Sequence, residues 1–173
     1  MAIQEVEIGE GLSHLFDAEL AYEDEVEPVV PDAGREGVLI GSGGGTVEGP
    51  AIQGTIRWSM YSGDCAYLLI KAGHEPPPGQ HLCTVNPAGV IETEDGASIW
   101  FDAKGYGLRG ADPALPHLWR LTMSLRFETD DARYAWLNSA LAVWLGTFDE
   151  KAGRAWYHAY APARQNGQRP NRG

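Results

Sequence analysis

The amino-acid sequence predicts an all-β protein, a single antiparallel β-barrel with one short helical turn. Residues 52–60 and 121–128 alternate strictly between apolar and polar side chains, which is the pattern of a strand with one buried face. Asp95-Gly96 between two strand-like segments is a strong hairpin signal. The whole chain holds about eight to ten such short strands. We favour a barrel over a sandwich because closure removes exposed sheet edges.

Length and composition fit one domain with a substantial core. The chain has 173 residues, of which 43% are hydrophobic and 21% charged. Six Trp, seven Tyr and four Phe can fill a barrel or line a pocket. We expect one barrel domain over residues 1–161 and a disordered tail over residues 162–173, because residues 164–173 lack apolar side chains.

The charge balance excludes several partners. Thirteen basic against 24 acidic side chains give a net charge of −11, which opposes binding to nucleic acid and to anionic membranes. No run of about 18 apolar residues occurs, and the first residues lack the basic and apolar regions of a leader. Cys65 and Cys83 match no close zinc or redox spacing and are expected to be reduced. The sequence predicts a cytoplasmic protein.

The first strand is predicted over residues 12–22, where Phe16, Ala18 and Leu20 share one face. By the same alternation His14 faces the apolar side. A lone histidine there is more often a core residue than a catalyst, although a histidine lining a barrel interior is well placed for proton transfer. Residues 23–36 are acidic and contain turn residues, which indicates a solvated loop.

Glycine dominates the next segment. After a short apolar strand at residues 38–40, residues 41–50 contain six glycines or prolines without the Gly-Lys-Ser/Thr ending of a phosphate loop. We interpret them as a bend or bulge at a barrel corner. The strand at residues 52–60 follows. Residues 62–64 are then predicted to turn, so that Asp64 lies at the entrance of a strand at residues 66–70.

The middle of the chain combines proline-rich loops with a hairpin. The proline-rich segment within residues 73–87 is equally consistent with a lid over a barrel mouth and with an inert crossover. Residues 90–93 and 97–101 pair around the Asp95-Gly96 turn. Residues 104–116 indicate a further loop, which holds Arg109.

The most informative stretch is residues 121–138. A strand ends near Glu128, and Thr129 or Asp130 can cap a short helical turn. Arg126 and Glu128 are two residues apart and therefore share a strand face, while the turn returns Tyr134 and Asn138 to the strand's end. The simpler alternative is a surface ion pair beside a structural corner. Beyond it, residues 140–145 are apolar on both sides, as in a strand buried between layers, and form a closing hairpin with residues 154–161.

Several segments resemble a known family. They are residues 12–16 (Leu-Ser-His-Leu-Phe), residues 44–50 with Gly54, residues 93–97, and residues 126–129 with residues 133–138. In this order they are similar to members of domain-of-unknown-function family 3237. The resemblance implies a compact barrel of the allene oxide cyclase and calycin-like kind. The chain departs from the family where relatives have Gly-Gly-x-Asp-Trp, because residues 62–65 here keep the aspartate and lose the tryptophan.

Strand faces and the resemblance together suggest a site. We predict that five residues converge on one end of the barrel and that His14 lines the interior below them; the five are Asp64, Arg126, Glu128, Tyr134 and Asn138. One carboxylate, with its pKa raised by burial, would transfer the proton. Arg126 would keep the other carboxylate ionised, and Tyr134 or Asn138 would donate to the developing oxyanion. The alternative is that Glu128 accepts N–H groups of the following turn and Arg126 braces it.

Three functions are compatible with this pattern. The first is a cofactor-independent lyase, isomerase or cyclase acting on a small hydrophobic or aromatic molecule. The second is a carrier of lipocalin type, and the third is an interaction module. Inward carboxylates without a compensating arginine would favour the enzyme, and an entirely apolar cavity would favour the carrier. No metal or other cofactor is expected, because the five histidines include no pair at ligand spacing on one element. A homodimer is compatible with the sequence, which does not set the oligomeric state.

Overall fold

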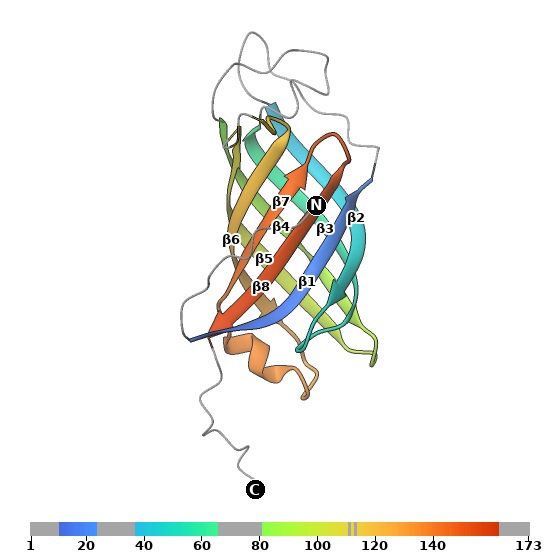
Figure 1. Ribbon diagram of the computed structural model, residues 1–173. Helices are drawn as coiled ribbons and strands as arrows, with labels where there is room; N and C mark the ends of the chain where they lie inside the picture. The colour runs from blue at the N-terminus through green and yellow to red at the C-terminus, as the bar shows by residue number, and fades with distance from the viewer. Residues whose placement is uncertain (1–10, 24–36, 66–80, 111, 113, 163–173) are drawn as a thin grey trace, which may run out of the picture.

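The protein folds as a closed antiparallel β-barrel (Figure 1). The computed structural model describes residues 11–23, 37–65, 81–110, 112 and 114–162. Each strand pairs with its neighbour in the sequence, and β8 pairs with β1 to close the sheet. The elements are β1 Leu12–Tyr22, β2 Gly37–Glu48, β3 Gly54–Cys65, β4 His81–Thr93, β5 Ser98–Arg109, β6 Leu118–Glu128, the 3₁₀ turn η1 Ala135–Ser139, β7 Ala142–Asp149 and β8 Arg154–Pro162.

Strand alternation produces the core, as predicted. In β6 every second side chain is buried, from Trp119 to Phe127, and the residues between them are exposed. The core predictions are confirmed for Ile52, Ile56, Trp58, Ile99, Leu125, Phe127 and Trp144, whose exposed fractions are 4% or less. Leu68 and Val143 are predicted to be buried as well; Leu68 lies outside the described residues, and the prediction for Val143 is wrong because its side chain is only half-buried.

The interpretation of residues 140–145 as a strand covered on both sides is wrong. Trp144 is fully buried, but its neighbour Val143 is only half-buried and lies on the outer wall. A closed barrel has a single inner face, so one side of each strand must meet solvent. The predicted hairpin of β7 and β8 is confirmed by their antiparallel register.

The glycine-rich segment is also different from its prediction. Instead of bending at a corner, residues 37–48 form one continuous strand, β2. A Cβ atom on Gly43 would lie 2.0 Å from the carbonyl oxygen of Ala21 and 2.9 Å from the Trp58 ring. Glycine is therefore required here because the Ala21 carbonyl of β1, and next to it the Trp58 indole, occupy the space that a side chain would need.

Aromatic side chains fill the middle of the barrel. The Trp144 ring contacts Phe16 and Phe101, with ring centroids 6.4 and 5.7 Å away, and stacks on Tyr157 at 4.4 Å. Both Trp144 and Tyr157 are buried. Such contacts contribute beyond their buried area and give the interior a rigid aromatic centre.

The two ends of the barrel differ. At the lower end in Figure 1 the segment between β6 and β7 folds back, and Leu137 of η1 is fully buried there. The predicted helical turn is thus present. The upper end carries the β5–β6 and β7–β8 connections. Predictions for residues 24–36, 66–80 and 163–173, including a strand at 66–70, a lid and a disordered tail, lie outside the described residues. No helix in the described part of the chain is long and apolar enough to cross a membrane.

Candidate functional site

The structure places Arg126 and Glu128 on the outer wall of β6. Arg126 Nη2 lies 3.6 Å from Glu128 Oε1, and the two side chains are 61% and 66% exposed. The prediction that they share a face is confirmed. Because an exposed ion pair in high dielectric is worth less than about 1 kcal/mol, the pair contributes little to stability. Its direction, away from the interior, separates it from any ligand held in the barrel.

Asp64 lies at the opposite end of the barrel. The lower end of β3 is Gly54, which pairs with Thr93, and the strand continues without a turn to Cys65 at the upper end. Glu128 is at the lower end, where it pairs with Trp100. The predicted turn at residues 62–64 and the convergence of Asp64 with Glu128 are therefore wrong. Ladder pairing of Gly63 with Thr84 keeps this glycine-containing segment extended.

His14 points outward, which corrects the prediction that it faces the interior. The register of β1 against β8 shifts between His14 and Phe16, so Leu15 is an extra residue in β1. Such a bulge reverses the alternation of side chains. Leu15 and Phe16 are both buried, while His14 is half-buried at the surface and lies 2.7 Å from Asp17 Oδ1.

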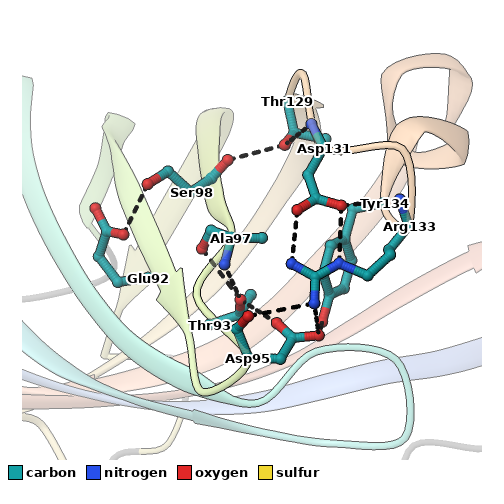
Figure 2. A network of polar contacts seen from close by, with 9 residues as sticks. All are labelled: Glu92, Thr93, Asp95, Ala97, Ser98, Thr129, Asp131, Arg133 and Tyr134. Atoms are coloured by element: carbon teal, nitrogen blue, oxygen red, sulfur yellow. Dashed lines mark hydrogen bonds and ion pairs between the residues drawn. The ribbon is translucent and has the colours of Figure 1, made fainter.

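Tyr134 takes part in a hydrogen-bonded cluster at the lower end, which we call the lower network (Figure 2). Its members are Thr93, Asp95, Asp131, Arg133 and Tyr134. The Tyr134 hydroxyl donates to Asp95 Oδ2 at 3.1 Å, and Thr93 Oγ1 donates to Asp95 Oδ1. Arg133 bridges the two carboxylates, at 2.9 Å from Asp95 and 2.6 Å from Asp131.

Electrostatics keep the lower network in fixed protonation states. The hydrogen bond from Arg133 lowers the pKa of Asp131 to about 2. The hydrogen bond from Thr93 is the largest cause that lowers the pKa of Asp95, and burial is the largest cause that raises the pKa of Tyr134. Both carboxylates therefore stay ionised and the phenol stays protonated near neutral pH, which is unsuited to general acid–base exchange.

Asn138 completes the attachment of η1. Its side chain accepts from the Thr129 N–H and donates to the Thr129 carbonyl, each at 2.9 Å. The amide thus closes the loop between β6 and η1 and fixes the position of Leu137. The lower network and Asn138 act as a structural brace. A catalytic role for the predicted site residues stays a prediction, but these residues do not form one site.

A second group of polar residues lies at the other end of the barrel, and we call it the upper cluster. It consists of Arg109, Trp119 and Glu150. The sequence pattern did not predict it as a site. Arg109 Nε donates to both Glu150 oxygens at 3.1 Å, and its Nη2 donates to Oε1 at 2.7 Å. Trp119 Nε1 donates to Oε2 at 3.0 Å. The Arg109 and Glu150 side chains are only 9% and 5% exposed. The predicted loop at residues 104–116 is wrong for Arg109, which ends β5, and only the pairing of β5 with β6 and of β6 with β7 brings it to Glu150.

Three aromatic rings continue the upper cluster across the barrel. The Tyr22 ring centroid is 4.5 Å from those of Trp58 and Phe148. Phe148 lies two residues before Glu150, so the aromatic and charged groups occupy the same end of the interior. Trp58 is 4% exposed, and its indole N–H has no acceptor among the described residues. An unsatisfied buried donor costs about 1–3 kcal/mol, which a ligand oxygen could offset.

Tyr157 and Cys83 are also buried in the interior. Burial is the main cause that raises the pKa of the Tyr157 phenol, with a smaller contribution from Cys83. The Tyr157 phenol therefore stays protonated at neutral pH and can donate a hydrogen bond. The described part of the interior therefore offers hydrogen-bond donors and a carboxylate paired with an arginine, set in an aromatic lining.

The fold and the interior define a small closed β-barrel. The lower network stabilises one end, and the upper cluster gives the interior of the other end its polar groups. The chain belongs to the DUF3237 family, described as proteins of unknown function, whose model matches residues 11–161. No curated protein matches the chain.

Three solved structures share the fold. A β-barrel-like protein from Acinetobacter baumannii is 20% identical, with a TM-score of 0.65, and the match covers 91% of this chain and 100% of that protein. A protein of unknown function from Clostridium acetobutylicum is 16% identical, with a TM-score of 0.66 and coverage of 91% and 100%. An enzyme from Penicillium herquei is 19% identical, with a TM-score of 0.57 and coverage of 91% and 99%. At these identities the likeness shows the fold alone.

Proposed function

We propose that the protein is a cofactor-independent enzyme, a lyase, isomerase or cyclase, that acts on a small aromatic or hydrophobic molecule held in the upper half of the barrel. The observation that carries this proposal is the Trp58 N–H, which has no acceptor in the part of the chain that the structure describes, at the same end of the interior as the inward carboxylate of Glu150. The enzyme from Penicillium herquei, which shares the fold, supports it by analogy.

The chemistry would be a proton transfer at carbon. The Glu150 carboxylate removes a proton from a C–H bond next to a carbonyl, and the electron pair moves to the carbonyl oxygen. Trp58 Nε1–H donates to that oxygen as it becomes negative. Return of the proton at another carbon completes an isomerisation, and loss of a leaving group from the same enolate completes an elimination. Each carboxylate oxygen accepts two hydrogen bonds, and the Arg109 Nε–H is shared between them, so one oxygen would give up its part of this shared bond to take the substrate proton.

A carrier is the second candidate, and one observation favours it. Glu150 is neutralised by Arg109 through three hydrogen bonds, whereas an uncompensated carboxylate is the feature expected of the enzyme. In a carrier the same pair would hold a polar group of the ligand without chemistry.

Proton exchange in heavy water separates the candidates. Purified protein, kept in a chelator, would be incubated in D₂O with phenols and aromatic ketones that have an acidic C–H bond, and exchange would be followed by proton NMR. The enzyme accelerates exchange. The double variant Arg109→Met/Glu150→Gln removes the carboxylate without leaving a buried charge, and should lower the exchange rate about a hundredfold or more. Glu128→Gln, on the outer wall, is the matched control and should keep the full rate.

Binding tests the role of Trp58 directly. Trp58→Phe keeps an aromatic ring but removes the N–H, and should weaken binding of a ketone ligand about tenfold, the scale of one hydrogen bond. Trp144→Phe is the control, because the Trp144 indole N–H also lacks a partner among the residues that the structure describes but lies beside the Phe101 ring. Ligands that bind tightly without any exchange would favour the carrier. Failure of every ligand to bind would contradict both candidates.

A further inference from the structure

The outer face of the β1–β8 junction gathers two histidines and one carboxylate. Asp17 and His158 are direct partners in the register that closes the barrel, and His158 Nδ1 lies 2.5 Å from Asp17 Oδ1. His14 Nε2 lies 2.7 Å from the same oxygen. One potential ligand atom from each residue falls within 4.8 Å of the others.

The bulge in β1 creates this arrangement. Residues 14 and 17 are three apart and would project from opposite faces of a regular strand. The extra residue, Leu15, places His14 on the face that carries Asp17. The Tyr160 ring lies 5.4 Å from that of His14 and 6.5 Å from that of His158, so an aromatic residue flanks both imidazoles.

We propose that His14, Asp17 and His158 bind one Zn²⁺ ion on the outer surface of the barrel. Two imidazole nitrogens and one carboxylate oxygen are a common ligand set for zinc, and three protein ligands leave a fourth tetrahedral position for water or a small anion. Tetrahedral coordination with bonds of about 2.0–2.1 Å separates ligand atoms by about 3.3 Å. The two Asp17 contacts would lengthen by less than about 1 Å to reach that value.

The surroundings favour a cation. The net charge is −11, and Glu48 on β2 is the register partner of Asp17 on its other side. His14 and His158 are partly buried at 34% and 28% exposed side chain, so both rings are held against the wall while their edges remain accessible. Both rings already point at Asp17, which reduces the ordering that metal binding requires.

Isothermal titration of chelator-treated full-length protein with Zn²⁺ tests the site. We expect the wild-type protein to bind one ion per chain at this site, and the affinity to be at least tenfold weaker in His14→Gln and in His158→Gln. His117→Gln is the matched control, because His117 lies at the upper end beside Asp149 and should leave the affinity unchanged. Circular dichroism would show that each variant is folded, and Asp17→Asn provides a third, size-matched variant should either histidine change prevent folding.

Cobalt binding gives a second, spectroscopic readout that does not depend on the heat of binding. Co²⁺ in a tetrahedral site absorbs strongly in the visible range, and we expect this band in the wild-type protein and its loss in Asp17→Asn. Zinc affinity that is changed less than tenfold in both histidine variants would overturn the proposal, as would the absence of saturable binding at about 1 mM Zn²⁺. The site lies outside the barrel, so this result is independent of whether the interior binds a ligand.

Discussion

Individual side chains decide how the lower end is closed. Leu137 is fully buried at the barrel end, whereas Leu141, four residues later, is 60% exposed. Asn138 holds the loop by pairing with both backbone groups of Thr129. The segment at residues 133–138 is one of those that resemble the family. It closes the barrel because Leu137 packs into its end and the polar groups around Leu137 are hydrogen-bonded.

Truncation of the Leu137 side chain should destabilise the whole barrel. Leu137→Ala should lower the free energy of unfolding by about 2–5 kcal/mol, because it removes buried methyl groups and leaves a cavity. Leu141→Ala should change it by less than about 0.5 kcal/mol. Urea unfolding followed by tryptophan fluorescence measures both. Equal losses in the two variants would show that the lower end is not closed by Leu137.

The Arg133–Asp131 pair should appear in the pH dependence of stability. Asp131 has a pKa of about 2 in the folded protein against 3.8 as the ordinary value, so its contribution is present above about pH 4 and is lost as the pH falls through 2. Arg133→Gln should raise the pKa of Asp131 and flatten the fall of the urea midpoint between pH 4 and pH 2. Arg126→Gln, on the exposed outer pair, should leave that slope as in the wild type. Carbon NMR titration of the carboxyl groups identifies Asp131 itself.

At the scale of elements, the β4–β5 hairpin illustrates agreement between local and global structure. The Thr93 N–H donates to the Ala97 carbonyl at 2.8 Å, and Thr93 Oγ1 accepts from the Ala97 N–H at the same distance. Gly96 adopts a φ of +86°, a conformation that other residues rarely take. The same turn then supplies Asp95 to the lower network, so one local motif forms the hairpin and anchors η1.

Substitution of Gly96 in this turn should lower the stability of the protein, whereas the strand residue Gly44 should tolerate substitution. Gly96→Ala should destabilise the protein by about 1–2 kcal/mol, because a Cβ atom is strained at positive φ. Gly44→Ala should cause no loss, since its Cβ would lie 3.5 Å from the nearest atom, a backbone oxygen of Ile56. Thermal unfolding monitored by circular dichroism compares them. A Gly96→Ala variant as stable as the wild type would mean that the turn relaxes without strain.

At the scale of the whole molecule, the barrel separates a braced end from a polar interior at the other end. The lower network satisfies its own groups, while the other end of the interior holds a buried ion pair and an indole donor that has no acceptor within the described ranges. Buried pairs depend on both partners, because a single charge left in the interior lacks solvation.

A double-mutant cycle at Arg109 and Glu150 should expose this dependence. Arg109→Met alone and Glu150→Gln alone should each destabilise the protein by about 3–5 kcal/mol, because each leaves a polar or charged partner unpaired. The double variant should recover most of that loss, since the introduced glutamine amide still offers an acceptor to Trp119. Guanidinium unfolding measures all four proteins. Additive losses would contradict a coupled buried pair.

The sequence by itself determined the features that depend on local pattern. Period-two alternation in residues 52–60 and 121–128 specified strands and their buried faces, and Asp95-Gly96 specified a hairpin. The segment at residues 133–138 indicated the short turn and the family. These signals are local because each depends on neighbours a few residues away in the chain.

The tertiary structure alone decided which polar residues meet. Alternation assigned His14 to the interior, but a one-residue bulge set by pairing with β8 turned it outward beside Asp17 and His158. Asp64 was placed with Glu128 from an expected turn, but ladder pairing on both sides carried β3 through to the far end. Arg109 and Glu150 are 41 residues apart and meet only because β5, β6 and β7 pair side by side. Register and closure are properties of paired strands, and a single strand's pattern does not contain them.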